Sequence, residues 1–234
     1  MHSVIRKLVI IPTYNELENM KALLPALMQL DEKFDVLVAD DSSPDKTSDF
    51  VTEFSKLNPR VNLLLRKQKS GLGKAYIAGF KWGLEKNYDA LIEMDADFSH
   101  RPEDLVKILQ ALETQNVVIG SRYVPGGHTV NWGLIRKMIS RGGGIYSRMI
   151  LGYPIQDWTG GFNGWRSQVL KDIGLDSIQS NGYSFQIELK YKAQKQGYKV
   201  LEVPIVFEDR RVGQSKMSLK IVIEAFYKVW LIRS

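Results

Sequence analysis

The sequence predicts an α/β protein with a mainly parallel central sheet flanked by helices, and two observations support this. Four short apolar runs suit strands that are buried on both faces, and they span residues 8–12, 34–39, 61–65 and 90–94. Amphipathic helical stripes lie between these runs, and parallel strands need crossover connections of a dozen or more residues, usually helices. The alternation therefore predicts consecutive βαβ units.

Each further element has a local signal. Residues 20–28 carry apolar side chains at the i, i+3, i+4, i+7 spacing of a helix, and residues 50–57 carry a second such stripe. A glycine-containing loop at 70–74 precedes a third helix that runs to residue 84. In the second half we expect a strand at 117–122, a basic helix around 136–148, a glycine-rich stretch at 157–165, a helix at 183–196 and a strand at 199–207.

The composition excludes several classes of protein. With 234 residues, 44% apolar and 25% charged, the chain is globular rather than disordered, and its length suits one large core. The absence of cysteine excludes disulfides, thiolate zinc sites and a cysteine nucleophile. A net charge of +6 indicates an anionic partner, and a nucleic acid, an anionic membrane and a phosphorylated metabolite all remain open at this point.

The ends of the sequence bear on membrane association. The N-terminus has no secretory apolar segment, and no run reaches the roughly 18 apolar residues of a spanning helix, so we expect a soluble or peripheral protein. We expect one domain over 1–218 and an amphipathic C-terminal helix over 219–234. Aromatic residues together with Lys228 and Arg233 suit a helix that lies in the lipid headgroup region, and a helix packed on the domain core or on a protein partner is the alternative.

Polar clusters follow three of the predicted strands, at 13–16, 40–45 and 95–100. The carboxyl ends of parallel strands meet at one edge of a sheet, which is where ligands bind in such folds. Asp95 and Asp97 supply two hard oxygen ligands that suit Mg²⁺ or Mn²⁺ bound together with substrate phosphates, with Ser99 and His100 nearby. The alternative is a solvated loop with two acidic turn residues.

Two other clusters have both a functional and a structural interpretation. Asp40 and Asp41 suit hydrogen bonds from a base or a ribose, or an ordinary Asx-turn. The loop Gly71-Leu72-Gly73-Lys74 can bring backbone N–H groups toward a phosphate, or simply precede a helix.

Basic residues supply the other half of the predicted site. They are Arg122, Arg136, Lys137, Arg141, Arg210, Arg211 and Lys216. Arginine binds phosphate bidentately, and Ser140 would share a helix face with Arg136. The alternative for this helix is a solvated or lipid-facing surface.

The motifs occur in the order found in family-2 glycosyltransferases, and the set resembles the dolichol-phosphate (polyprenol-phosphate) mannosyltransferases over residues 8–218. The motifs are Pro12-Thr13-Tyr14-Asn15-Glu16, Asp40-Asp41-Ser42-Ser43-Pro44-Asp45-Lys46-Thr47, Gly71-Leu72-Gly73-Lys74-Ala75, Met94-Asp95-Ala96-Asp97-Phe98-Ser99-His100-Arg101-Pro102, Gly120-Ser121-Arg122-Tyr123, Ile139-Ser140-Arg141-Gly142, Gly182-Tyr183-Ser184-Phe185-Gln186-Ile187-Glu188 and Gly213-Gln214-Ser215-Lys216, with Arg210. Lys46 stands where glycine is common, Asn163-Gly164 differs from the bulkier residues often seen there, and this chain lacks the C-terminal membrane spans of some members.

The resemblance implies a metal-dependent enzyme with a GT-A fold, a GDP-mannose donor and a polyprenyl or dolichyl phosphate acceptor. It places Pro12, Tyr14, Glu16, Asp41, Gly73, Lys74, Asp95, Ala96, Arg210 and Lys216 at the nucleotide sugar. It places Asp95 and Asp97 on the Mg²⁺ or Mn²⁺ ion, and Arg122, Arg136 and Ser140 on the acceptor phosphate. Asp97, Arg122 and Arg210 would act in catalysis. The implied location is the cytosolic face of a membrane, with peripheral contact and a membrane-anchoring partner protein.

The acceptor chemistry predicts that the enzyme needs no general base. A phosphate monoester has its second pKa at about 6, so its oxygen is already charged at pH 7 and can attack the sugar with inversion. We therefore expect a structural or acceptor-orienting role for Glu188, and sugar contacts or only a tight turn at Asp157 and Trp158. Two alternatives are another polyprenyl-phosphate glycosyltransferase that uses a UDP-sugar, and a non-catalytic binding subunit. We expect no nucleic acid partner, because the chain lacks interleaved aromatic and basic residues.

Overall fold

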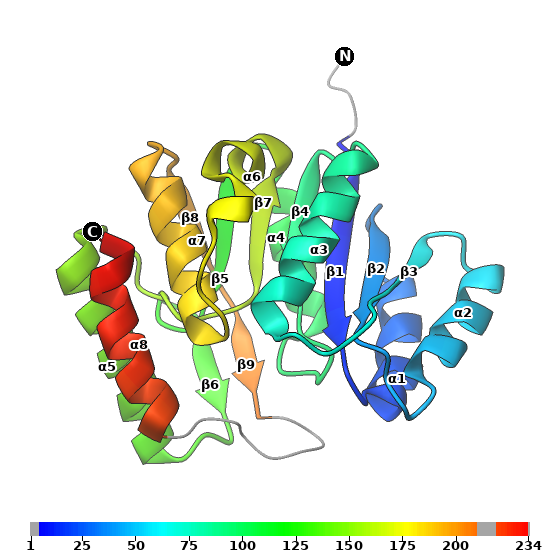
Figure 1. Cartoon of the computed structure of the whole chain (residues 1–234), viewed down its shortest axis with the longest axis horizontal. Helices are drawn as coiled ribbons and strands as arrows, with labels where there is room; N and C mark the ends of the chain where they lie inside the picture. Colours follow the sequence, from blue (N-terminus) through cyan, green and yellow to red (C-terminus); the bar gives the residue numbers. More distant parts are fainter. Residues whose placement is uncertain (1–4, 210–218, 234) are drawn as a thin grey trace.

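The computed structural model describes residues 5–209 and 219–233, and a seven-stranded sheet with helices on both faces forms its centre (Figure 1). The strand order is β3-β2-β1-β4-β7-β5-β8. All neighbouring strands are parallel except at β7, which is antiparallel to β4 and to β5. The prediction of a mainly parallel sheet is confirmed.

The first half is built from βαβ units, as the alternation of apolar runs predicts. Its strands are β1 (Lys7–Thr13), β2 (Asp35–Asp40), β3 (Val61–Leu65) and β4 (Ala90–Glu93). Its helices are α1 (Leu17–Met28), α2 (Thr47–Leu57), α3 (Leu72–Glu85) and α4 (Pro102–Ala111). The register pairs Thr13 with Asp40, so β1 and β2 end side by side and the loops after them are neighbours.

The second half is less regular. Its helices are α5 (Leu134–Leu151), α6 (Ser167–Ile173), a 3₁₀ turn (Leu175–Ser177), α7 (Tyr183–Lys195) and α8 (Leu219–Arg233). Its strands are β5 (Val117–Ser121), β6 (His128–Val130), β7 (Asn163–Arg166), β8 (Val200–Pro204) and β9 (Val206–Glu208).

The prediction of one strand over 199–207 is wrong, because the chain changes sheets at Ile205. Up to Pro204 it pairs with β5 in the central sheet, and after Ile205 it pairs with β6 in a second, two-stranded sheet. The Ile205 N–H donates to the Ser121 carbonyl (3.1 Å), and the Ile205 carbonyl accepts from the His128 N–H (3.1 Å). This residue therefore joins the two sheets.

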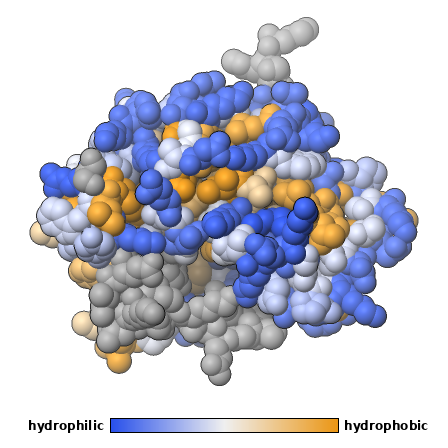
Figure 2. Space-filling model, in the orientation of Figure 1, coloured by the Kyte–Doolittle hydropathy of each residue, from blue (hydrophilic) through white to orange (hydrophobic). Residues whose placement is uncertain are grey.

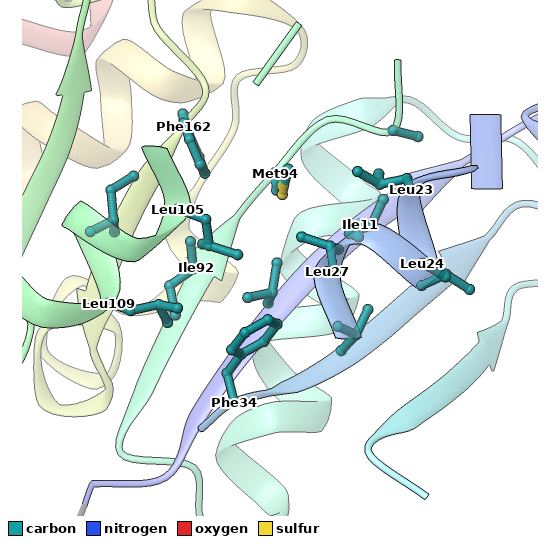
Figure 3. Packing of buried hydrophobic residues seen from close by; sticks show 14 of the residues in the cluster. Ile11, Leu23, Leu24, Leu27, Phe34, Ile92, Met94, Leu105, Leu109 and Phe162 are labelled. Carbon is teal, nitrogen blue, oxygen red and sulfur yellow. The ribbon is translucent and has the colours of Figure 1, made fainter. Parts of the chain in front are cut away.

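The core lies on both faces of the central sheet. Val9 and Ile11 of β1 pack on one face with α1 and α4, while Leu8 and Ile10 pack on the other with α3, α6 and α7. Figure 3 shows the first of these clusters, where the labelled leucines of α1 and α4 lie against Ile11, Ile92 and Phe34. Burial of alternate residues on opposite faces is what the continuous apolar runs require. Within the described ranges, no helix combines the length and hydropathy that crossing a bilayer requires.

The loops after β1 and β2 contain three non-glycine residues with positive φ. These are Asn15 (59°), Ser42 (55°) and Lys46 (68°). Asparagine tolerates this left-handed region better than other side chains, whereas a lysine there costs about 1–2 kcal/mol. The position at which Lys46 departs from the family's usual glycine is thus one whose backbone conformation favours glycine.

We expect Lys46→Gly to stabilise the protein by roughly 0.5–1 kcal/mol, because glycine removes the left-handed strain but loses more chain entropy on folding. Urea denaturation measures this change. Lys56→Gly, the same substitution inside the last turn of α2, is the control and should cost about 1 kcal/mol. Equal losses of unfolding free energy in the two variants would show that backbone strain at Lys46 does not lower the stability of the protein.

Candidate active site

The carboxyl ends of β1 and β2 form one side of the site, and Asp40 and Asp41 have different roles there. Asp40 is a turn residue: its carboxylate accepts from the Thr13 hydroxyl (2.8 Å) and from the Ser43 N–H (2.9 Å). The Asp41 carboxylate pairs with Arg66, a residue that carried no local signal in the sequence. Burial raises the pKa of Asp41, and the Arg66 charge opposes this. The Asx-turn interpretation thus describes Asp40, and a ligand contact at Asp41 stays a prediction.

Hydrogen bonds fix the 13–16 loop against the 43–47 loop. The backbone N–H of Asn15 donates to the Ser43 hydroxyl (3.0 Å), and that of Glu16 donates to the Thr47 hydroxyl (3.2 Å). Between them the Tyr14 ring is partly exposed, and the Lys69 ammonium lies 3.8 Å from its centroid. Tyr14, Glu16 and Asp41 therefore have defined relative positions, next to Pro12 at the end of β1.

Gly73 and Lys74 lie in the first turn of α3. A Cβ on Gly73 would lie 3.0 Å from ring carbons of Phe185, so this glycine permits close contact between the starts of α3 and α7. Lys74 is exposed. The packing role of Gly73 is visible in the structure, and contact of this loop with a phosphate stays a prediction.

Asp95 and Asp97 follow β4 as predicted. The Tyr76 hydroxyl donates to Asp95 Oδ1 (3.1 Å), and the Ser99 N–H donates to Asp97 Oδ1 (3.1 Å). The Asp95 N–H donates to Nδ1 of His100 (3.0 Å), which must therefore lack a proton, and burial lowers the pKa of His100 to about 4. His100 thus positions the motif as a neutral ring, with its Nδ1 occupied.

A metal ion at this point would need ligands beyond those that the described residues provide. Among the residues that the structure describes, no group of three or more His, Asp or Glu side chains is arranged around one point. Asp95 and Asp97 provide two carboxylates, with the buried Ala96 between them. This donor set fits Mg²⁺ or Mn²⁺ that completes its shell with phosphate oxygens and water.

Arg122 and Asp157 form a buried ion pair on the opposite side of the site. Arg122 donates from Nε (2.7 Å), from Nη2 (2.6 Å) and from its backbone N–H (3.0 Å) to the Asp157 carboxylate. Burial alone would raise the pKa of Asp157, but the Arg122 charge lowers it to about 2. The plane of the Arg122 guanidinium is therefore fixed by a fully buried anion.

Arg136 and Ser140, both on α5, lie close to Arg122. The Arg122 and Arg136 guanidinium carbons are 5.4 Å and 4.0 Å from the Trp132 ring centroid, so both arginines lie against one indole. Arg136 also donates to Asp209 (2.7 Å), and Ser140 accepts from the Tyr123 hydroxyl (2.7 Å). The three residues predicted for an anionic group thus gather around Trp132 and Tyr123.

Aromatic rings connect the acidic side to the basic side. The His100 ring stacks on Phe162 (centroids 4.5 Å apart) and meets the edge of Phe207 (5.4 Å). Phe207 in turn lies 5.3 Å from Trp132. Phe207 and Trp132 are functional candidates that carried no recognisable signal in the sequence.

A network of buried polar side chains lies beneath the site. Asn163 donates to Glu93 (2.8 Å) and to Gln186 (2.8 Å), and the Lys190 ammonium donates to the carbonyls of Asp157 and Gly160 (2.8 Å each). Burial raises the pKa of Glu93 to about 8 and lowers the pKa of Lys190 to about 8. The network connects the end of β4 through β7 and α7 to the loop that carries Asp157.

Glu188 and Trp158 have structural surroundings. The Glu188 carboxylate accepts from the backbone N–H groups of Ser180 (2.9 Å) and Gln179 (3.3 Å). Trp158 and Asp157 are fully buried, so the expectation of sugar contacts at these two residues is wrong for this structure. Arg210 and Lys216 lie outside the described residues.

Comparisons with known proteins identify the family of this chain. Residues 8–174 match a family model described as Glycosyl transferase family 2. An undecaprenyl-phosphate mannosyltransferase of Micrococcus luteus is 49% identical over 96% of this chain and 92% of its own length. A polyprenol monophosphomannose synthase of Mycolicibacterium smegmatis is 46% identical over 97% of this chain and 88% of its own length.

Solved structures establish the GT-A fold. The glucosyl-3-phosphoglycerate synthase of Mycobacterium tuberculosis, in complex with Mn²⁺, UDP and glucosyl-3-phosphoglycerate, has a TM-score of 0.68 at 16% identity, over 97% of this chain and 78% of that one. The mannosyltransferase PcManGT of Pyrobaculum calidifontis, in complex with GDP-Man and Mn²⁺, has a TM-score of 0.58 at 16% identity, over 90% of this chain and 58% of that one.

We expect Asp157→Asn to destabilise the protein by about 3 kcal/mol at pH 7, because it leaves the buried Arg122 charge without its anion. The pKa of Asp157 lies below its ordinary value, so the wild-type protein loses this contribution as the pH falls from about 4 to 2. The stability difference between variant and wild type should therefore shrink over that range. Denaturant titrations at several pH values measure it.

Asp176→Asn is the matched control. Asp176 pairs with Lys81 at the surface and is 88% exposed, so its loss should cost less than about 1 kcal/mol at any pH. A loss in Asp157→Asn as small as in the control would contradict the assignment of Asp157 as the anchor of Arg122.

Proposed function

This chain belongs to glycosyl transferase family 2, and on that premise we propose that it transfers mannose from GDP-mannose to a polyprenyl or dolichyl phosphate, giving a β-mannosyl phosphate and GDP. The names of two relatives, at 49% and 46% identity, support the acceptor class and the sugar. The supporting geometry has two parts. Asp95 and Asp97 form an acidic half-site, and Arg122, Arg136 and Ser140 form what we call the acceptor half-site. The rings of His100, Phe207 and Trp132 connect the two. Such a site suits two substrates: one that binds a metal ion at the carboxylates, and one that presents a phosphate to the arginines.

The donor is proposed to lie along the ends of β1, β2 and β4. Asp41 would accept hydrogen bonds from the nucleoside, beside Pro12, Tyr14 and Glu16. Arg66 already pairs with Asp41, and its charge opposes the rise in the Asp41 pKa that burial causes. Gly73, Lys74, Arg210 and Lys216 would lie along the donor phosphates, as the family resemblance implies.

The proposed cofactor is Mg²⁺ or Mn²⁺, held by Asp95 and Asp97 together with oxygens of the donor diphosphate. When bound, such an ion stabilises the charge that develops on the leaving diphosphate. The residues of this chain orient the two carboxylates: Tyr76 and the Ser99 N–H each donate to one of them. Arg210 and Lys216 are proposed to add positive charge near the same diphosphate.

The acceptor phosphate is proposed to bind between Arg122, Arg136 and Ser140. It would replace Asp209 as the partner of Arg136, while Asp157 keeps the Arg122 guanidinium oriented. A phosphate oxygen would then attack C1 of mannose from the face opposite the diphosphate. The bond from C1 to the diphosphate oxygen breaks, and its electron pair leaves with GDP. The acceptor oxygen carries no proton that must be removed, and Glu188 is engaged by backbone N–H groups.

The lipid acceptor also bears on location. We propose that the enzyme works as a peripheral protein at the cytosolic face of a membrane, with residues 1–218 as the catalytic domain and 219–234 as an interfacial helix. A membrane-anchoring partner protein belongs to the same proposal.

The direct test is a transfer assay with labelled GDP-mannose or UDP-glucose, a short polyprenyl phosphate, and Mg²⁺ or Mn²⁺, followed by extraction of the lipid product. We expect transfer from GDP-mannose. Asp97→Asn should lower turnover more than tenfold at saturating metal, because the leaving diphosphate loses charge stabilisation. Asp49→Asn, on the exposed side of α2, should not change it. Transfer from UDP-glucose alone would overturn the choice of donor, and absence of transfer from either would support a binding subunit.

Arg136→Ala should separate the two substrates. We expect the acceptor KM to rise roughly ten- to hundredfold, because a charge-assisted contact to phosphate is lost, while calorimetry shows unchanged GDP-mannose binding. Lys171→Ala on α6 serves as the control. Equal weakening of donor and acceptor binding would contradict the assignment of Arg136 to the acceptor half-site.

A further inference from the structure

Helix α5 buries small residues along most of its inner face, with Leu151 at its end, and exposes most of its large apolar residues. Its buried positions include Ser140, Gly144 and Ser147, which are spaced at three and four residues. The outward stripe consists of Leu134 (74% exposed), Ile135 (75%), Met138 (66%), Ile145 (54%) and Met149 (75%). An amphipathic helix of a globular protein normally packs the other way round. The outward face of α5 therefore lacks a partner within the residues that the structure describes.

Helix α8 extends this surface. The Trp230 indole N–H donates to the Tyr146 hydroxyl of α5 (2.7 Å), and the rings of Tyr146 and Phe226 lie 4.2 Å apart. Val229 faces the core, while Phe226, Tyr227, Trp230 and Leu231 are exposed. Figure 1 shows α5 and α8 side by side at one end of the molecule, and Figure 2 shows hydrophobic surface there.

Exposed apolar residues are concentrated on this surface. Of the fifteen large hydrophobic side chains exposed among the described residues, ten belong to α5 or α8. We call the exposed side of these two helices the α5–α8 face. A contiguous apolar patch of this kind indicates an interaction site, whereas single exposed apolar residues elsewhere need no explanation.

The net charge of the chain is located on the same two helices. Helix α5 contains four basic residues and no acidic one, and α8 contains three basic residues and one acidic residue. Together they account for the whole net charge of +6, so the rest of the chain is balanced. On α5, Lys137, Arg141 and Arg148 flank one side of the apolar stripe. The occupant of the α5–α8 face must therefore accept apolar side chains and be anionic.

We propose that the α5–α8 face docks on an anionic lipid bilayer, with both helices lying in the headgroup region. Large apolar and aromatic residues beside lysine and arginine are the composition of interfacial helices, and each basic residue near an anionic surface adds to binding. A second copy of this chain fits poorly, because it would place two basic faces together. The docking of this face does not require the transfer activity proposed above.

Docking through α5 would place the acceptor half-site at the lipid surface. Arg136 and Ser140 belong to the same helix as the outward stripe, and an α-helix with its side chains is about 10–12 Å across. A phosphate in the headgroup layer would thus lie within about one helix diameter of Arg136. This step rests on the proposed function, since it assumes that the acceptor is a lipid phosphate.

The test is co-sedimentation of the full chain with vesicles of phosphatidylcholine, with and without phosphatidylglycerol. We expect binding that requires phosphatidylglycerol and weakens with added salt. The double variant Ile135→Glu/Met149→Glu should bind at least tenfold more weakly. Leu57→Glu is the matched control: this leucine is 86% exposed on α2, outside the α5–α8 face, and its replacement should not reduce binding.

Two outcomes would overturn the proposal. Unchanged vesicle binding in the double variant would show that another surface docks. Absence of vesicle binding by the wild-type chain would indicate that a protein covers the α5–α8 face instead. Sedimentation velocity would then show whether that protein is a second copy of this chain.

Activity distinguishes this proposal from the proposed function. With a short, water-soluble polyprenyl phosphate, the double variant should turn over like the wild-type protein, and with a long acceptor in vesicles it should be slower. Equal slowing with both acceptors would overturn docking as the role of this face. A wild-type chain that binds vesicles but transfers no sugar would disprove the function and leave docking supported.

Discussion

The ion pair between Arg122 and Asp157 is the interaction on which the second half of the structure depends. Arg122 directly follows β5, and Asp157 lies in a loop whose carbonyls accept hydrogen bonds from the buried Lys190 of α7. Removing two charges from water is costly, and only mutual pairing with further hydrogen bonds offsets that cost. Here the Arg122 side chain and the backbone N–H groups of Arg122 and Gly160 donate to the Asp157 carboxylate. Lys190 donates to carbonyls of the same loop. The result is an arginine that stands beside Trp132 in one orientation.

The same network explains an unusual stretch of sequence. A Cβ on Gly164 would lie 2.7 Å from a methyl carbon of Leu112 and 2.8 Å from one of Ile108, so glycine lets β7 lie close to these two side chains. Asn163, next to it, joins Glu93 of β4 to Gln186 of α7. At Asn163-Gly164, where bulkier residues are often seen, the glycine thus permits close packing of neighbouring side chains and the asparagine makes buried polar contacts.

The sequence predicts the first half of the fold and the positions of its acidic residues, because strand periodicity and parallel connections place Asp41, Asp95 and Asp97 at one edge. It does not predict the antiparallel β7, because this strand begins with asparagine and glycine, which are uncommon in strands, and because its partner strands are distant in sequence. It also gives no sign that Phe207 lies against His100, or that Ile205 ends one sheet and begins another. Such contacts join segments about a hundred residues apart, and only tertiary packing decides them.

Helix α5 carries the outward apolar stripe and Arg136 together, and this has a kinetic consequence. An enzyme held at a bilayer through the helix that also binds its acceptor searches for that acceptor by lateral diffusion. Its effective acceptor concentration is then the mole fraction of polyprenyl phosphate in the lipid. Inert lipid dilutes the acceptor, whereas a larger volume of buffer leaves that fraction unchanged. The rate of such an enzyme therefore saturates with the surface density of the acceptor in the membrane, and not with its concentration in the bulk solution.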